Sequence, residues 1–206
     1  MKIRLSPRVA LLVIAAMFLL PLALAWLMYS GTIEFKPAST RNLGQLVEPP
    51  LPLSWENARL DSPGSQEPAV AVFGEHWTVL YTLAAPCAEA CIEQVTGLRQ
   101  VHRAAGRQQQ RIRLALLLPD QASPELKKGL MDIYGNFHLI SDPSGALSAR
   151  LAQVSLPGTP AGAAGTVYLV DPLANIMMVY APGSDPNNLK QDLKRLLTWS
   201  KLDEQS

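Results

Sequence analysis

The stretch WTVLYTLAAPCAEAC, residues 77–91, decides the fold because it joins a buried strand to the start of a helix. Its first part, residues 77–83, is a short run of apolar and β-branched residues, which is typical of a strand at the centre of a sheet. From residue 87 to about residue 105, side chains at helical steps of three and four predict a helix that ends near Gly106: Cys91, Val95, Leu98 and His102.

Strands and helices alternate along the rest of the C-terminal part. We expect strands at residues 69–73 and 112–118, a brief strand at 139–140, and a hairpin of 166–170 with 176–180. We expect helices from residue 124 towards 134, over 146–153 and over 187–199. This order predicts an α/β fold with a thioredoxin-like central sheet and helices on both faces.

An apolar segment near the N-terminus predicts a membrane anchor. Residues 9–29 contain no charged side chain, and a helix of that length covers roughly 30 Å, the thickness of the hydrocarbon core of a bilayer. The basic residues Lys2, Arg4 and Arg8 precede it, so we expect residues 1–8 to be a cytoplasmic tail and the rest to be exported. A cleaved signal peptide is the alternative, because Ala23-Leu24-Ala25 has the pattern of a cleavage site.

The 206 residues are sufficient for one domain beyond this anchor. Residues 30–68 are Pro-rich and predict an extended stalk, or an arm that lies against the domain formed by residues 69–206. The three basic residues of the tail are part of 18 Lys and Arg, which leaves 15 against 17 Asp and Glu. A slightly acidic exported part excludes a nucleic-acid-binding protein.

The two cysteines, Cys87 and Cys91, carry the chemistry that the sequence predicts. They follow a buried strand and lie at the start of a helix, where unpaired N–H groups favour a thiolate. Residues four apart in a helix have Cβ atoms about 5 to 6 Å apart, whereas a disulfide needs about 4.5 Å, so closing the pair requires the first turn to loosen. We expect a strained, easily reduced bond that interconverts with the dithiol; a static disulfide and two unpaired packing cysteines are the alternatives.

Two segments resemble a known family. WTVLYTLAAPCAEAC and the hairpin TVYLVDPLANIMMVY, residues 166–180, resemble the Sco family of copper-handling cytochrome c oxidase assembly proteins. Those proteins are membrane-tethered thioredoxin-like domains with a CxxxC motif, and the resemblance extends over residues 77–199. The segments NLGQLVEPPLPL, residues 42–53, and LRQVHRAAG, residues 98–106, look like a divergent proteobacterial branch of oxidase-associated membrane proteins.

The chain departs from the family pattern at two positions. The proline that usually follows the second cysteine is replaced by Ile92, and the histidine that serves as the third copper ligand corresponds to Ala163. The resemblance therefore implies copper ligation by Cys87 and Cys91 with the third ligand missing.

No other side chain is expected to complete the metal site. His102 lies about 16 Å from Cys91 along the helix, His76 lies some 20 Å from Cys87 along the strand, and His138 is expected at the opposite end of the sheet. Met177 and Met178 are adjacent strand residues that point to opposite faces, so neither is expected to bind copper. Glu89 either tunes the charge of the thiolate or is a solvated carboxylate at the start of the helix.

The leading interpretation is a protein of the bacterial inner membrane with its thioredoxin-like domain in the periplasm. It assists cytochrome c oxidase assembly through Cys87 and Cys91, by thiol redox chemistry or by copper handling, with oxidase subunits as partners. One alternative is a non-catalytic assembly partner whose site has degenerated. Another is a general disulfide exchange enzyme, although that class normally carries a CxxC motif.

Overall fold

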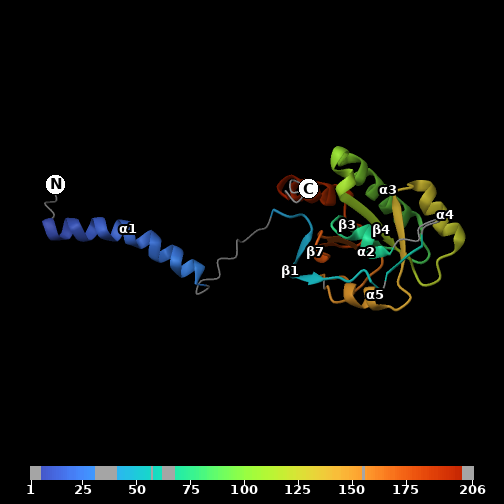
Figure 1. Cartoon of the computed structure of the whole chain (residues 1–206), viewed down its shortest axis with the longest axis horizontal. Helices are drawn as coiled ribbons and strands as arrows, with labels where there is room; N and C mark the ends of the chain where they lie inside the picture. Colours follow the sequence, from blue (N-terminus) through green and yellow to red (C-terminus); the bar gives the residue numbers. More distant parts are fainter. Residues whose placement is uncertain (1–5, 31–40, 57, 62–67, 155, 201–206) are drawn as a thin grey trace. The chain divides into compact units, whose positions relative to one another are not determined.

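The computed structural model describes residues 6–30, 41–56, 58–61, 68–154 and 156–200. The chain divides into two compact units, Met1–Arg41 and Asn42–Ser206 (Figure 1). Residues 1–5 of the expected cytoplasmic tail and residues 31–40 and 62–67 of the expected stalk lie outside the described residues.

Helix α1, Pro7–Tyr29, makes up most of the first unit. The hydroxyl of Ser6 accepts a hydrogen bond from the backbone N–H of Val9, and proline occupies the first helical position, as a helix N-terminus favours. The stretch Pro7–Leu27 is long and apolar enough to cross a membrane, and none of it is buried within the protein. It is therefore a candidate single membrane span, although a signal sequence near the N-terminus has the same length and composition.

The second unit is a sheet of seven strands covered by helices. The strands are β1 Gln45–Pro52, β2 Arg59–Leu60, β3 Trp77–Thr82, β4 Ile112–Leu117, β5 Phe137–Ser141, β6 Val167–Val170 and β7 Asn175–Tyr180. The helices are α2 Ala69–Phe73, α3 Glu89–Ala104, the 3-10 helix η1 Gly106–Arg111, α4 Pro124–Ile133, α5 Ala146–Leu151 and α6 Pro186–Trp199.

The strand order is β1-β7-β6-β3-β4-β5-β2. Strands β3, β4 and β5 are parallel, whereas β6 runs antiparallel to β3 and forms the expected hairpin with β7. All six residues of β3 are buried, because the strand has a neighbour on each side and helices above and below it. The carboxyl end of this central strand leads directly to the cysteines.

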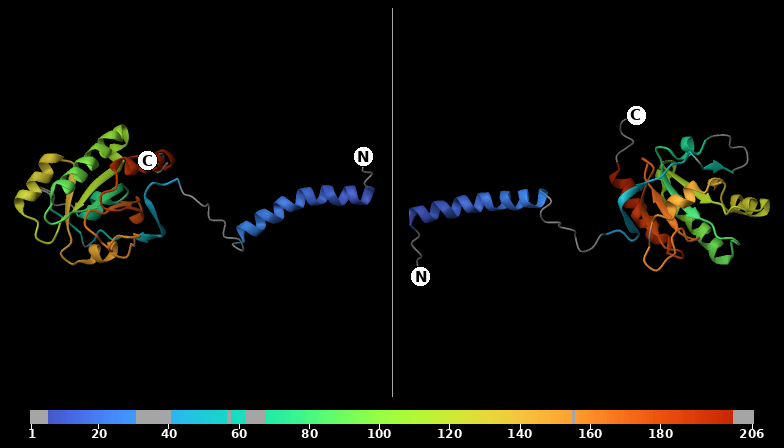
Figure 2. Two further views of the ribbon diagram at one scale, coloured as in Figure 1. Left: turned by 180° about the vertical axis from the view of Figure 1, so that it is seen from behind. Right: turned by 90° about the horizontal axis from the view of Figure 1, so that it is seen from below.

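Two hydrophobic layers flank the sheet. Val79 and Tyr81 of β3 pack with buried residues of α3, α4 and α6 on one face, and Leu80 packs with residues of α2 and α5 on the other. Figures 1 and 2 show α3 and α5 on opposite sides of the strands. The expected thioredoxin-like sheet with helices on both faces is confirmed.

The prediction of a strand at residues 69–73 is wrong, because this segment is helix α2. Ala69 and Phe73 are four residues apart and both buried, as one face of a helix requires. The ring of Phe73 packs against Trp55 with 4.5 Å between ring centroids. The sheet offers no place for this strand beside β3, since β4 and β6 already pair with it.

The Pro-rich segment before the domain contributes to both edges of the sheet. Strand β1 pairs with β7 and strand β2 pairs with β5, and Leu53 and Trp55 between them are buried. The compact second unit accordingly begins at Asn42.

A buried carboxylate fixes the start of this segment. The backbone N–H groups of Leu43 and Gly44 both donate to Oδ2 of Asp192 at 2.9 Å, and the hydroxyl of Tyr180 donates to the same oxygen at 3.0 Å. A Cβ atom at Gly44 would lie 2.6 Å from the ring of Tyr180, so only glycine fits at this point. Burial raises the pKa of Tyr180, and the charge of Asp192 raises it further.

Candidate redox site

The two cysteines lie across the start of helix α3. Strand β3 ends at Thr82, and the backbone N–H of Leu83 still donates to the carbonyl of Leu117 at 3.0 Å. Cys87 precedes the N-cap residue Ala88, whereas Cys91 lies in the first turn. The sequence predicted Cys87 at or inside the first turn, but it lies just before the helix. The distance between Cys87 and Cys91 is therefore not fixed by the i, i+4 spacing of a regular helix.

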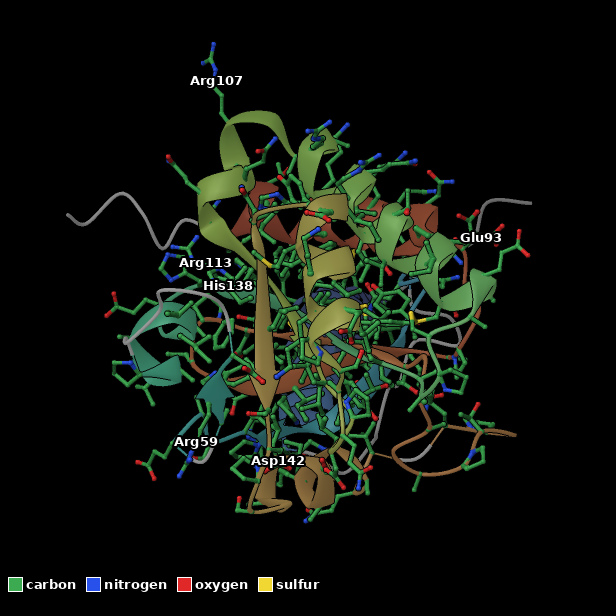
Figure 3. The ribbon with its side chains drawn as sticks, turned by 90° about the vertical axis from the view of Figure 1, so that its right-hand side faces the viewer. Arg59, Glu93, Arg107, Arg113, His138 and Asp142 are labelled. Carbon is green, nitrogen blue, oxygen red and sulfur yellow. A yellow bond between two sulfur atoms is a disulfide. The ribbon has the colours of Figure 1, made fainter. Side chains whose placement is uncertain are left out.

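The sulfur atoms of Cys87 and Cys91 are joined in a disulfide with an S–S distance of 2.03 Å and a Cα–Cα distance of 5.2 Å (yellow in Figure 3). The backbone N–H groups of Cys91 and Ile92 both donate to the carbonyl of Ala88, which closes the first turn beside the bond. The two residues are therefore brought together at the end of the central strand.

The two cysteines differ in exposure. Cys91 is 6 % exposed and belongs to the hydrophobic core below α3, with Val95 and Leu98. Cys87 is half-buried and packs at the margin of the same core. Pro86 and Ala88 on either side of it are exposed. A reacting molecule therefore has access to Cys87 from solvent, whereas Cys91 is shielded.

The loop that carries Ala163 is tied to the end of β3. The hydroxyl of Thr82 donates to the carbonyl oxygen of Ala163 at 3.0 Å, and the hydroxyl of Thr166 donates to it at 2.7 Å. The backbone N–H of Thr166 donates in turn to the hydroxyl of Thr82 at 3.1 Å, and Gly165 N–H donates to the Thr82 carbonyl at 2.7 Å. Ala163 thus belongs to the loop beside the strand that leads to the cysteines, but its methyl group cannot bind a metal.

The histidines have other partners. His102 is buried: Tyr134 hydroxyl lies 2.8 Å from Nδ1, and the carbonyl of Gln109 lies 3.2 Å from Nε2. Burial lowers the pKa of His102. His76 contacts Arg113 at the start of β4, and His138 packs edge-on against Phe73 with 5.6 Å between ring centroids. None of these described contacts involves a cysteine.

The methionines and Glu89 add no ligand set. The sulfur of Met178 is buried and lies 3.0 Å from the hydroxyl oxygen of Tyr180, whose proton is donated to Asp192, and Met177 is half-buried against the core. Glu89 is an exposed carboxylate in the first turn of α3, where negative charge is favoured. Within the described part of the chain, no group of three or more His, Cys, Asp or Glu side chains could hold a metal ion.

Sequence reasoning missed the two threonines that hold the loop. Thr82 is one of two threonines in the buried strand β3, and a buried hydroxyl usually has a hydrogen-bond partner. This signal did not separate Thr82 from Thr78, whose hydroxyl has no partner among the described residues. Thr166 was expected only as the first residue of the hairpin, since its contact with Ala163 depends on the shape of the loop.

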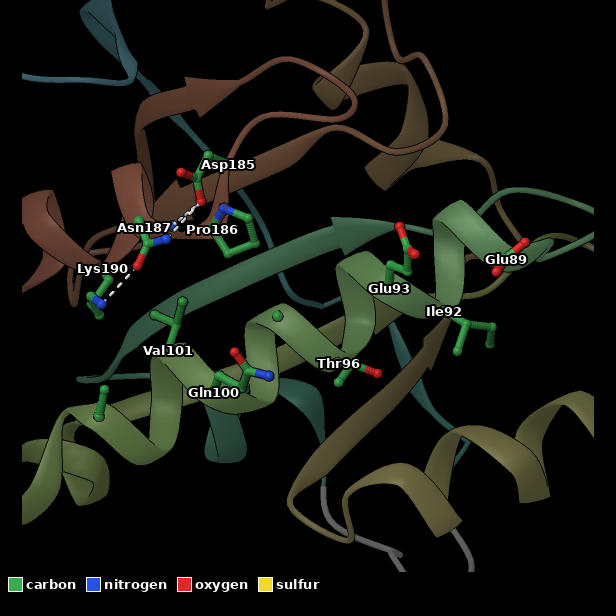
Figure 4. Close-up of a pocket in the computed structure, with 12 residues that line it drawn as sticks. Glu89, Ile92, Glu93, Thr96, Gln100, Val101, Asp185, Pro186, Asn187 and Lys190 are labelled. Atoms are coloured by element: carbon green, nitrogen blue, oxygen red, sulfur yellow. Dashed lines mark hydrogen bonds between the residues drawn. The ribbon is translucent and has the colours of Figure 1, made fainter.

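A groove of 810 Å³ between α3 and the start of α6 adjoins the site (Figure 4). Glu89, Ile92 and Glu93 line it near the cysteines. On the other side, Lys190 of α6 and Asp185, the N-cap residue of that helix, line it. The helices approach closely at its floor, because a Cβ atom at Gly97 would lie 2.5 Å from Pro186. The surface beside the disulfide is therefore concave and carries more negative than positive side chains.

Residues 77–200 match the family model described as "transmembrane-like, thioredoxin-like, C-terminal domain". No match is found among curated protein sequences.

Three solved structures share the fold. Apo Sco1 from Thermus thermophilus is 18 % identical with a TM-score of 0.56, over 77 % of this chain and 99 % of that one. A DsbF homologue from Corynebacterium diphtheriae is 18 % identical with a TM-score of 0.54, over 78 % and 96 %. Yeast Sco1 with copper bound is 12 % identical with a TM-score of 0.50, over 65 % and 85 %. These similarities confirm the Sco-like, thioredoxin-like fold that the sequence predicts.

Proposed function

The chain belongs to the family of transmembrane-like, thioredoxin-like C-terminal domains, and from this premise we propose that Cys87 and Cys91 are a redox-active pair that exchanges disulfides with a partner protein. The observation that carries the proposal is the closed bond between a half-exposed and a buried cysteine at the end of the central strand. In open α/β sheets, reactive sites lie beyond the carboxyl ends of the strands.

A bridge that encloses three residues has little structural value. It removes little entropy from the unfolded chain, because the closed loop is very short. The second unit also has two extensive hydrophobic layers, so its stability does not depend on a disulfide cross-link. Reactivity is therefore a better reason for the pair than stabilisation.

The exchange follows from the difference in exposure. In the dithiol form, the thiolate of Cys87 attacks one sulfur of a disulfide in the partner, and the other partner sulfur leaves as a thiolate. Cys91, as a thiolate, then attacks Cys87 Sγ, and the second partner sulfur leaves. Two electrons pass to the partner, whose two sulfurs take up protons, and the Cys87–Cys91 disulfide of this structure is the product. The positive end of α3 favours the Cys91 thiolate before its attack.

We place this reaction in cytochrome c oxidase assembly, on the outer face of a bacterial inner membrane. The apolar helix α1 supports a membrane location, and the basic residues before it support an exported domain. The CxxxC spacing and the Sco-like fold support an oxidase subunit as the partner, since the resemblance to the Sco family implies that role.

Copper handling is a second candidate because yeast Sco1, solved with copper bound, shares the fold. The donor set does not fit a three-ligand site, because Ala163 has no donor and the described residues hold no cluster of three ligands. Two thiolates alone suit a soft Cu(I) ion as cargo. This candidate therefore requires the reduced pair and predicts weaker retention of the ion than a complete site would provide.

Trapping of the partner tests the redox proposal in the full chain with its membrane helix. In Cys91→Ser, attack by Cys87 leaves a mixed disulfide that cannot be resolved, so a partner should accumulate as a covalent adduct on non-reducing gels. Cys87→Ser should trap far less, since Cys91 is buried. Ala90→Ser, an exposed neighbour in the same turn, is the matched control and should behave as the parent.

Oxidase activity of cells that carry Cys87→Ser/Cys91→Ser separates the remaining interpretations. Loss of activity together with trapping supports disulfide exchange. Loss without trapping, with Cu(I) binding by the reduced parent that the double variant lacks, supports copper handling. Full activity in the double variant refutes both and leaves the non-catalytic binding partner.

A further inference from the structure

A second pocket lies at the end of the parallel strands opposite to the cysteines. Its volume is 620 Å³, and η1, the start of β4 and the turn before β5 form its walls. Its polar lining includes Arg107, Gln110, Arg113, Asn136 and His138. None of the described residues that line it is an aspartate or a glutamate.

Arg113 supplies a fixed positive charge at this pocket. Its Nε donates to the Val72 carbonyl at 3.3 Å, one terminal nitrogen donates to the Gln110 carbonyl at 3.0 Å, and the other donates to His76 Nε2 at 2.8 Å. A guanidinium has five N–H donors, so two remain for a ligand. Its partners among the described residues are all neutral, although the side chain is half-buried, and a partly desolvated cation favours a counter-ion.

His76 holds this guanidinium without adding charge. Its Nδ1 lies 2.6 Å from the Gly74 carbonyl, which can only accept, so Nδ1 carries the proton. Its Nε2 faces an N–H of Arg113 and must therefore accept. Both contacts require the neutral ring, so His76 positions Arg113 and leaves its charge uncompensated.

His138 is a free donor on the same side of the sheet. It is half-buried, lines the pocket and lies close to Arg113 in Figure 3, whereas Arg107 extends away into solvent. Its ring contacts Phe73, and neither ring nitrogen has a hydrogen-bond partner among the described residues. Burial, reinforced by the positive charge of Arg113, holds its pKa at about 4. A neutral ring at pH 7 has one N–H to donate.

We propose that this pocket binds a small oxyanion of the phosphate type, held by Arg113, His138 and Asn136. A phosphate group presents several acceptor oxygens, which match the two remaining guanidinium donors, the imidazole N–H and the exposed amide. The source is either free phosphate or the headgroup of an anionic phospholipid, since both present the same chemistry. A bound anion also offsets the repulsion from the surrounding cations, so it raises the titration midpoint of His138.

Imidazole NMR of the full chain in zwitterionic nanodiscs tests the proposal with inorganic phosphate as the probe. At constant ionic strength, phosphate should shift the His138 signals saturably and raise their titration midpoint. Arg113→Met should weaken binding by roughly tenfold or more. Arg59→Gln removes an exposed arginine of β2 that does not line the pocket and should bind as the parent does. Unchanged His138 signals, or equal shifts in Arg113→Met and the parent, overturn the proposal.

Two further arms complete the test. Asn136→Ala, in an exposed turn, should weaken phosphate binding severalfold and serves where Arg113→Met does not fold; equal binding in Asn136→Ala and Arg59→Gln then overturns the proposal. Nanodiscs with phosphatidylglycerol and no phosphate show whether a lipid headgroup is the source. The His138 signals shift in these nanodiscs only if the pocket binds the lipid headgroup. Cys87→Ser/Cys91→Ser should bind phosphate normally, so failure here is distinguishable from failure of the redox function.

Discussion

The hydroxyl of Thr82 donates a hydrogen bond of 3.0 Å to the carbonyl oxygen of Ala163, across 81 residues of sequence. This contact links the strand that delivers the cysteines to the loop in which the Sco resemblance expects a histidine. The loop therefore lies beside the strand that leads to the proposed site. It lacks a metal-binding side chain, because Ala163 carries only a methyl group.

Replacing Ala163 with histidine should create the missing ligand. We expect the reduced Ala163→His variant to bind Cu(I) roughly tenfold more tightly than the parent, or about 1.4 kcal/mol, because an imidazole joins two thiolates. Competition with a Cu(I) chelator measures the affinity. Ala164→His, on the exposed next residue, is the control. Equal affinities for the two variants would mean that position 163 does not face the cysteines.

Removing the hydroxyl of Thr82 should destabilise the domain. Thr82→Val leaves Thr166 N–H without its acceptor and breaks the bond to Ala163, at a cost of about 1 to 3 kcal/mol in the free energy of unfolding. Thr78→Val is a matched control on the same strand, since the buried hydroxyl of Thr78 has no hydrogen-bond partner in the described part of the chain. That change should be neutral or stabilising. Urea unfolding measures both, and an equal loss in the two variants would contradict the assignment.

Removing the carboxylate of Asp192 should release the start of the arm. Asp192→Ala leaves Leu43 N–H, Gly44 N–H and the Tyr180 hydroxyl without their acceptor, and we expect a loss of about 2 to 4 kcal/mol. Urea unfolding gives the loss, and limited proteolysis reports the release. Asp132→Ala breaks only the exposed ion pair with Lys128 and should cost less than about 0.5 kcal/mol. Resistance to proteolysis equal to that of the parent would refute the anchoring role.

Acid should destabilise the domain through His138. Its pKa is lowered from 6.5 to about 4, mainly by burial, so the unfolded chain binds this proton more tightly than the folded one. The contribution is complete above pH 6.5 and is lost as the pH falls towards 4. Allowing for partial exposure, it amounts to about 1 to 3 kcal/mol. Unfolding of the parent and His138→Gln between pH 4 and 7 measures it; identical pH slopes would show that His138 is not responsible.

Much of the fold was predictable because strands and helices follow from local spacing. The buried strand at residues 77–82 and helix α6 both follow the period of their apolar residues. Residues 69–73 were predicted wrongly as a strand, since five small and apolar residues do not distinguish a strand from a short buried helix. The cysteines were identifiable for the same local reason, as a close pair after a buried strand.

By itself, the sequence determined the alternation of strands and helices, the apolar N-terminal helix and the place of two cysteines at a strand-to-helix junction. These depend on residues that are neighbours in the chain. Only the tertiary structure decided that Thr82 is hydrogen-bonded to Ala163 and that Gly44 is hydrogen-bonded to Asp192. It also decided that Arg113 has only neutral partners among the described residues. Such contacts join residues 81 and 148 positions apart, and they exist because the order of strands in the sheet brings those residues together.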